Sequence, residues 1–73
     1  MEASKAVLMG IKTVKDSGKV KDMYDRRQVQ LFAFEMGFYE TANWLNLHKD
    51  DYFLLYLTTD WDNVLSLYKK EDE

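Results

Sequence analysis

Residues 25–37, DRRQVQLFAFEMG, decide the fold class, because their apolar side chains recur at the spacing of an α-helix. The side chains that share one face of this predicted helix stand at positions i, i+3, i+4 and i+7: Val29, Phe32, Ala33 and Met36. Asp25 is a favourable N-cap residue, and Gly37 is a typical helix stop. Leu31 and Phe34 lie off that face, and a helix that is apolar on more than one side is either central or covered by a partner.

Another helix is predicted on the N-terminal side of this stretch. Ser4 is a good N-cap residue. The apolar stripe that follows it consists of Val7, Leu8, Ile11 and Val14. A glycine inside a helix costs about 1 kcal/mol against alanine, so we expect Gly10 to be there because it allows another helix to approach closely. The helix is predicted to end at Gly18, and residues 19–24 are predicted to form a loop.

Further helices are predicted on the C-terminal side, the first over residues 38–48. Residues 52–59, YFLLYLTT, have the composition of a strand, but the sequence contains no second strand with which they could pair. We therefore expect a short buried helix there, with Asp50 or Asp51 as its N-cap. A last helix is predicted to begin at Asp60, and its apolar repeat consists of Trp61, Val64, Leu65 and Tyr68.

The sequence therefore predicts one all-α domain over residues 1–73, a compact bundle of four to five short helices with a frayed tail at residues 71–73. A chain of this length buries only about 60% of the surface that it exposes when unfolded, so its core is marginal. It contains no cysteine, which excludes disulfides and thiolate metal sites. Additional stability must come from close helix packing or from oligomerisation.

Aromatic residues make up 15% of the chain, which is more than so small an interior easily holds. Apolar side chains that gather on a surface usually mark an interface, and Tyr and Trp are favoured anchors for protein partners. The sequence therefore predicts a protein partner, with a homo-oligomer expected. The predicted anchors are five rings: Phe34, Tyr39, Trp44, Tyr56 and Trp61. The alternative, that these rings only fill the core and its rim, stays open.

Residues that could carry catalysis or bind a metal ion are scarce. His48 is the one histidine, and the nearby Asp50 and Asp51 are explained by capping and solvation. The calcium-loop pattern, the phosphate-binding glycine loop and the nucleophile elbow are all absent from the sequence. We therefore expect no catalytic residue, no cofactor and no metal site, and a protein that is not an enzyme.

DNA binding is the main alternative function. Residues 29–45 have the outline of a helix-turn-helix, in which the second helix enters the major groove. Phosphate contacts from lysine and arginine dominate affinity for DNA. The residues that could make such contacts here are Lys19, Lys21, Arg26 and Arg27. The turn is about two residues shorter than the motif requires, and the predicted second helix offers Glu40 and Asn43 but no arginine. The sequence therefore favours a protein partner over nucleic acid.

Charge is distributed unevenly along the chain, with +2 over residues 1–37 and −5 over residues 38–73. A dipolar surface of this kind can steer self-association or docking, although two ordinary solvated faces would give the same pattern. The longest uninterrupted apolar run, residues 52–57, is far shorter than the roughly 20 residues of a membrane span. No targeting signal is recognisable. We therefore expect a cytoplasmic protein without membrane contact.

A series of short motifs between residues 7 and 60 supports a family resemblance. The motifs are Ile11 with Val14, Asp16-Ser17-Gly18, Met23-Tyr24-Asp25, Val29-Gln30, Ala33, Gly37-Phe38-Tyr39-Glu40, Trp44-Leu45 and Tyr52. In their order and spacing they resemble a family of small phage and prophage proteins of Gram-positive bacteria that is described only as a domain of unknown function. The resemblance implies a phage or mobile-element origin and no defined activity.

These observations predict a small phage-type interaction module that binds and modulates, by inhibition, a host, defence or phage protein. Small acidic phage proteins often act in this way, which is an analogy at the level of class. A DNA-binding regulator of the helix-turn-helix type is one alternative. A virion assembly component is another, and the sequence does not separate it from the first prediction because the two differ only in their partner.

Overall fold

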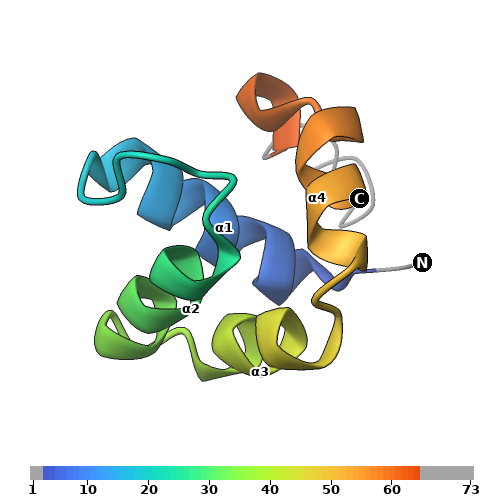
Figure 1. Ribbon diagram of the computed structural model, residues 1–73. Helices are drawn as coiled ribbons and strands as arrows, with labels where there is room; N and C mark the ends of the chain where they lie inside the picture. The colour runs from blue at the N-terminus through green and yellow to red at the C-terminus, as the bar shows by residue number, and fades with distance from the viewer. Residues whose placement is uncertain (1–2, 65–73) are drawn as a thin grey trace.

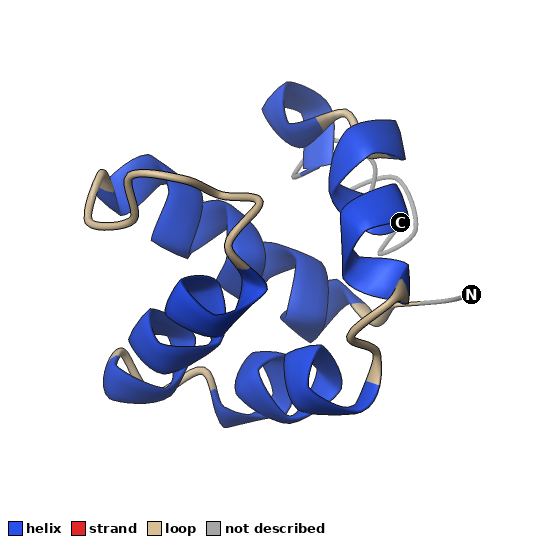
Figure 2. Ribbon diagram, viewed as in Figure 1, coloured by secondary structure: helices blue, strands red, loops and turns tan. Residues whose placement is uncertain are grey.

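The computed structural model describes residues 3–64, and its regular structure is helical throughout that part of the chain. Four α-helices follow one another, and a single turn of 3-10 helix comes after them (Figures 1 and 2). Their bounds are α1 Lys5–Ser17, α2 Arg26–Glu35, α3 Tyr39–Leu47, α4 Asp51–Thr58 and η1 Trp61–Asn63. The prediction of a small all-α bundle is confirmed. Residues 52–58 are helical as predicted, but Thr59 is extended, and the helix is buried on only one side instead of throughout.

The ends of α1 are those predicted from the sequence. Ser4 has an extended backbone and its Oγ accepts a hydrogen bond from the Val7 N–H, which satisfies one of the unpaired donors of the first turn. Gly18 ends the helix at a φ of +72°, in the left-handed region that favours glycine, and its N–H donates to the Lys15 carbonyl. The loop 19–25 then leads to α2.

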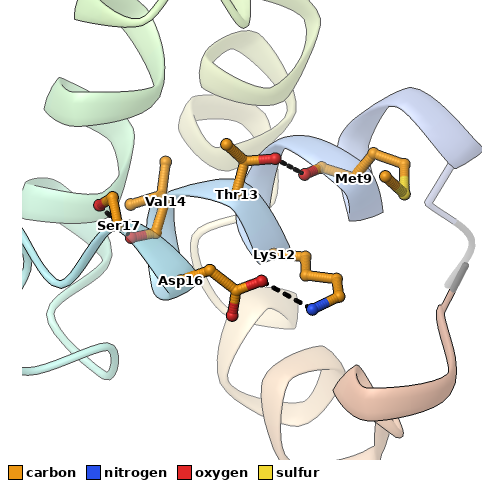
Figure 3. Close-up of polar contacts among 6 residues, drawn as sticks. All are labelled: Met9, Lys12, Thr13, Val14, Asp16 and Ser17. Carbon is orange, nitrogen blue, oxygen red and sulfur yellow. Dashed lines mark hydrogen bonds and ion pairs between the residues drawn. The ribbon is translucent and has the colours of Figure 1, made fainter.

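Polar side chains of α1 form hydrogen bonds within the helix itself (Figure 3). The Thr13 hydroxyl donates to the Met9 carbonyl at 2.8 Å, and Lys12 Nζ donates to Asp16 Oδ2 at 2.7 Å. The hydrogen bond from Lys12 lowers the pKa of the Asp16 carboxyl. Both of these side-chain hydrogen bonds stay within α1 and do not join it to another helix.

A Schellman motif joins α2 to α3. The Phe38 N–H donates to the Ala33 carbonyl at 2.8 Å, and the Gly37 N–H donates to the Phe34 carbonyl at 3.1 Å. The motif requires a left-handed residue, and Gly37 supplies it with a φ of +88°. The chain therefore reverses within three residues and brings α2 and α3 side by side (Figure 1).

The core is made by the inward sides of α1, α2 and α3, with Tyr52 and Leu55 of α4 added to it. Gly10 is buried where α1 crosses α3, and a Cβ added to it would lie 2.0 Å from Thr41 Oγ1. The prediction that Gly10 allows close approach of a second helix is therefore confirmed. The Thr41 hydroxyl lies within 3.2 Å of the Ala6 carbonyl and 3.4 Å of the Val7 carbonyl, so it links the two helices.

α4 lies at the edge of the bundle in Figure 1 and does not pack closely on any of the other three helices. Its inward Tyr52 is buried and donates a hydrogen bond to the Met23 carbonyl of the loop 19–25 at 2.5 Å. Burial raises the pKa of the Tyr52 hydroxyl, which therefore keeps the proton that it donates. One tyrosine thus ties α4 to a loop that has no regular structure of its own.

The predicted caps after residue 48 differ from those observed. Asp50 occupies the N-cap position of α4 without a side-chain hydrogen bond to the helix, and Asp60 stands before η1 in the same way. Asp51 instead faces His48 Nδ1 at 3.2 Å, and Asp60 Oδ2 accepts from Asn63 Nδ2 at 2.7 Å. The predicted last helix begins as a 3-10 turn. Its continuation through Leu65 and Tyr68 and the tail at residues 71–73 lie outside the described residues.

Within residues 3–64, none of the helices has the length and apolar composition needed to cross a membrane.

Candidate interaction surfaces

The five predicted anchor rings fall into two groups. Phe34 and Tyr39 are exposed, at 58% and 63% of their full accessible surface. Trp44 and Trp61 are buried, each with only 8% of its surface accessible. Tyr56 is half-buried and packs against the core. Phe34 and Tyr39 therefore expose more than half of their surface to a partner, whereas the two tryptophans expose almost none.

The placement of the two tryptophans corrects the sequence analysis. The Trp61 indole N–H donates to the Tyr56 carbonyl at 3.0 Å, and the two rings lie 5.5 Å apart. Trp44 lies flat against the His48 ring, with 4.6 Å between ring centres. Both indoles therefore fill the interior and its edge. A large ring is a favoured interface anchor, but its burial also contributes most to the stability of a small core.

The outward side of α4 carries a patch that the aromatic count missed. Phe53, Leu54 and Leu57 are 54%, 58% and 60% exposed, and their spacing puts them on one side of the helix. Tyr24 extends the patch, because its ring meets Phe53 edge to face at 5.1 Å. We call these three α4 residues and Tyr24 the α4 face. The sequence did indicate this patch, because the uninterrupted apolar run of residues 52–57 leaves a helix there without a polar side.

Acidic side chains border the α4 face at both ends. Asp50 and Asp51 stand at the start of α4, and Asp60 and Asp62 follow its end. Residues 50–64 contain no lysine or arginine. The two ends of α4 that flank this apolar face therefore carry only negative charge.

A groove between α2 and α3 has the opposite charge. It consists of two adjoining hollows of about 490 and 250 Å³. Arg26, Arg27 and Lys49 line it, and no carboxylate does among the residues that the structure describes. Its other lining residues are amides and apolar groups: Gln30, Asn43, Asn46, Leu31, Phe34, Tyr39 and Ala42. We call this the α2–α3 groove.

The side chains of the α2–α3 groove are held in place by contacts between the two helices. Arg26 Nη1 donates to Gln30 Oε1 at 2.6 Å and to the Leu45 carbonyl, near the end of α3, at 3.2 Å. A cation there suits the negative end of a helix. Phe34 and Tyr39 meet edge to face, with ring centres 5.2 Å apart. The groove thus contains a cation held in place, Arg26, and an aromatic pair, Phe34 with Tyr39.

The four cations predicted for nucleic-acid contact divide between two places. Arg26 and Arg27 line the α2–α3 groove, where Lys49 joins them. Lys19 and Lys21 are exposed in the loop 19–25 and do not line it. The sequence analysis did not include Lys49 among these cations. It lies beyond α3 in the sequence and reaches the groove only because α3 packs on α2.

Side chains that could act as metal ligands or as an acid–base pair are sparse in the part of the chain that the structure describes. His48 lies 3.2 Å from one carboxylate, that of Asp51, and is partly open to solvent. No group of three or more potential metal ligands occurs within residues 3–64. The features of the described chain that stand out are therefore its two surfaces, the α4 face and the α2–α3 groove.

Comparison with known proteins finds no match among curated proteins and none among solved structures. The model of one protein family does match, over residues 4–60, which span α1 to α4 and end before η1. The resemblance to a family without an assigned function is confirmed at that level. The chain belongs to the family described as "Domain of unknown function (DUF5049)".

Proposed function

We propose that this chain is a small protein–protein interaction module and that the α4 face is its docking surface. The observation that carries the proposal is the exposure of Phe53, Leu54 and Leu57 on a helix that also buries Tyr52 and Leu55. A helix that is apolar on all sides is normally covered on all sides. Burial of the three exposed side chains would contribute about 3–5 kcal/mol, which is enough to organise a binding site.

The rim of the α4 face defines the chemistry of the partner. Asp50 and Asp60 border it at opposite ends, so the matching surface is apolar with basic side chains around it. Complementary potentials of this kind speed association and exclude wrong partners. We include in the proposal a phage origin and an inhibitory action on a host, defence or phage protein. A place in virion assembly would use the same face with a different partner.

The proposal is tested by a pair of matched variants. Leu57→Glu removes the centre of the α4 face, and Leu47→Glu makes the same change at an equally open leucine of α3. Each tagged protein is used to capture partners from a host lysate, and each captured protein is then purified and remixed. We expect a defined complex, measured by light scattering, that forms with wild type and Leu47→Glu but not with Leu57→Glu. Equal binding by both variants contradicts the proposal.

A second candidate function, nucleic-acid binding, is favoured by the α2–α3 groove. Three cations and three side-chain amides gather there, and amides can pair with the edges of bases. Titration of a DNA duplex and a single strand at two salt concentrations tests this candidate. Each lost phosphate contact should reduce the slope of log affinity against log salt by about 0.7–0.9. Arg27→Gln should therefore lower the slope, while Lys19→Gln, outside the groove, should leave it unchanged.

A further inference from the structure

We propose that the partner of the α4 face is the α2–α3 groove of a second copy of this chain, in a head-to-tail contact. This inference rests on the proposed function, because it names the surface that the docking helix meets. The resulting interface is heterologous, so each copy offers α4 to one neighbour and its groove to another. Such contacts close into a ring or continue as a filament.

Charge is the first argument. The α4 face is bordered by Asp50, Asp51 and Asp60, and the groove carries Arg26, Arg27 and Lys49 without a carboxylate within the described chain. Arg27 and Lys49 are exposed and form no ion pair among residues 3–64, so their charges remain available. A symmetric α4-to-α4 contact would instead bring acidic rims together. The head-to-tail arrangement instead places the acidic ends of each α4 against a basic groove.

Shape and composition are the second argument. Leu31, Phe34 and Tyr39 are exposed along the groove at 53%, 58% and 63%. Helices that bind in grooves do so through apolar residues spaced at helical intervals. Phe53, Leu54 and Leu57 provide such a set on the short helix α4. All of the large hydrophobic residues exposed in the described chain, apart from Leu47, belong to the α4 face or line the groove, so the two surfaces match in kind as well as in charge.

The position of the two surfaces is the third argument. α4 holds its inward side against the core through Tyr52 and Leu55, so Leu54 and Leu57 point away from the bundle. α4 does not pack closely on α2, and α1 lies between them in Figure 1. The α4 face therefore cannot enter the groove of its own chain, and only another molecule can bring the two surfaces together.

The experiment mixes two variants that lose different halves of the contact. Leu57→Glu disrupts the α4 face, and the double variant Arg27→Glu with Lys49→Glu reverses the groove. Both leave the core untouched, and far-UV circular dichroism verifies their folding. Mass is measured by sedimentation over a concentration series, because an interface this small should have a Kd of about 10 μM to 1 mM.

Wild type should grow beyond a dimer as its concentration rises, and added salt should weaken the association. Each variant alone should remain a monomer. Their equimolar mixture should form a one-to-one heterodimer and stop there, because one intact α4 face meets one intact groove. Leu47→Glu should assemble like wild type.

Three results overturn the inference. The first is self-association of the groove variant alone, which assigns the contact to α4 against α4. The second is failure of the two variants to combine although wild type assembles. The third is a wild type that stays monomeric at about 1 mM, the upper end of weak interfaces. This last result removes the second copy as partner but does not touch the capture experiment with Leu57→Glu, so the two proposals fail separately. If an oligonucleotide then binds wild type but not the groove variant, the groove belongs to nucleic acid.

Discussion

Replacement of Gly10 by alanine is the sharpest test of how this bundle is held together. A Cβ at residue 10 would meet Thr41 Oγ1 at 2.0 Å, Cβ at 2.8 Å and Cγ2 at 3.1 Å. Rotation of the Thr41 side chain can move the first and third atoms. It cannot move the threonine Cβ, which is fixed to the backbone of α3. The two helices must therefore separate.

The size of the effect follows from three terms. Alanine gains about 1 kcal/mol over glycine from helix propensity. Overpacking of a tight contact costs about 1–3 kcal/mol or more, and this overlap is at the severe end. Loss of the Thr41 hydrogen bonds to the Ala6 and Val7 carbonyls costs about 1–2 kcal/mol. We expect Gly10→Ala to lower the free energy of unfolding by about 3–4 kcal/mol, the sum of these terms.

Urea unfolding followed by tryptophan fluorescence provides the assay, since Trp44 and Trp61 are both buried. Gly18→Ala serves as the control, because nothing lies within 4 Å of its added Cβ and only the left-handed φ of +72° opposes it. It should cost about 1–2 kcal/mol, by strain alone. Thr41→Ala should relieve part of the damage at residue 10 and none at residue 18. A Gly10→Ala protein as stable as wild type would refute the close contact between α1 and α3.

Three smaller effects should accompany this one. Ser4→Ala removes the cap of α1 and the hydrogen bond that Ser4 donates to Glu40 of α3, so urea unfolding should show a loss of about 1 kcal/mol. Tyr52→Phe leaves the Met23 carbonyl without its buried donor and should cost about 1–2 kcal/mol by the same assay, whereas the exposed Tyr39→Phe should cost nothing measurable. The pKa of Tyr52 is raised above its value in the unfolded chain, so the stability linked to it is complete below pH 10 and is lost as pH rises above that value. A free energy of unfolding that falls no more steeply above pH 10 in wild type than in Tyr52→Phe would contradict this linkage.

Local rules predicted the helix ends of the first half of the chain with success. Ser4, Asp25, Gly18 and Gly37 each perform the capping or stopping role that their chemistry suggests. The rules depend on residues only a few positions apart, so no tertiary information was needed. Asp50 and Asp60 failed the same rule, although they stand at the expected places. Helix N–H groups compete with nearby side-chain donors for an aspartate carboxylate, and residue type alone does not decide which donor it accepts from.

The placement of side chains on one or the other side of a helix was harder to predict. Trp44 and Trp61 turned inward, whereas Leu54 and Leu57 turned outward. Helical spacing defines which residues share a side but not which side meets the core. That choice is made by the neighbours, and in α4 both sides are apolar. The α2–α3 groove was also beyond prediction, because Lys49 joins Arg27 only after two helices have packed.

An exposed apolar patch can be a docking surface or an accident of a small core, and stability separates the two. If the α4 face serves a partner, it contributes little to the isolated chain. Leu57→Glu should then change the free energy of unfolding by less than about 0.5 kcal/mol, as surface substitutions do. The buried Leu55→Ala, two residues away, should cost about 2–5 kcal/mol. Measured in dilute protein, a loss of more than about 1 kcal/mol for Leu57→Glu would mean that the chain itself covers this face. A stable variant that no longer binds is the result that assigns α4 to a partner, because the loss of binding then cannot come from loss of the fold.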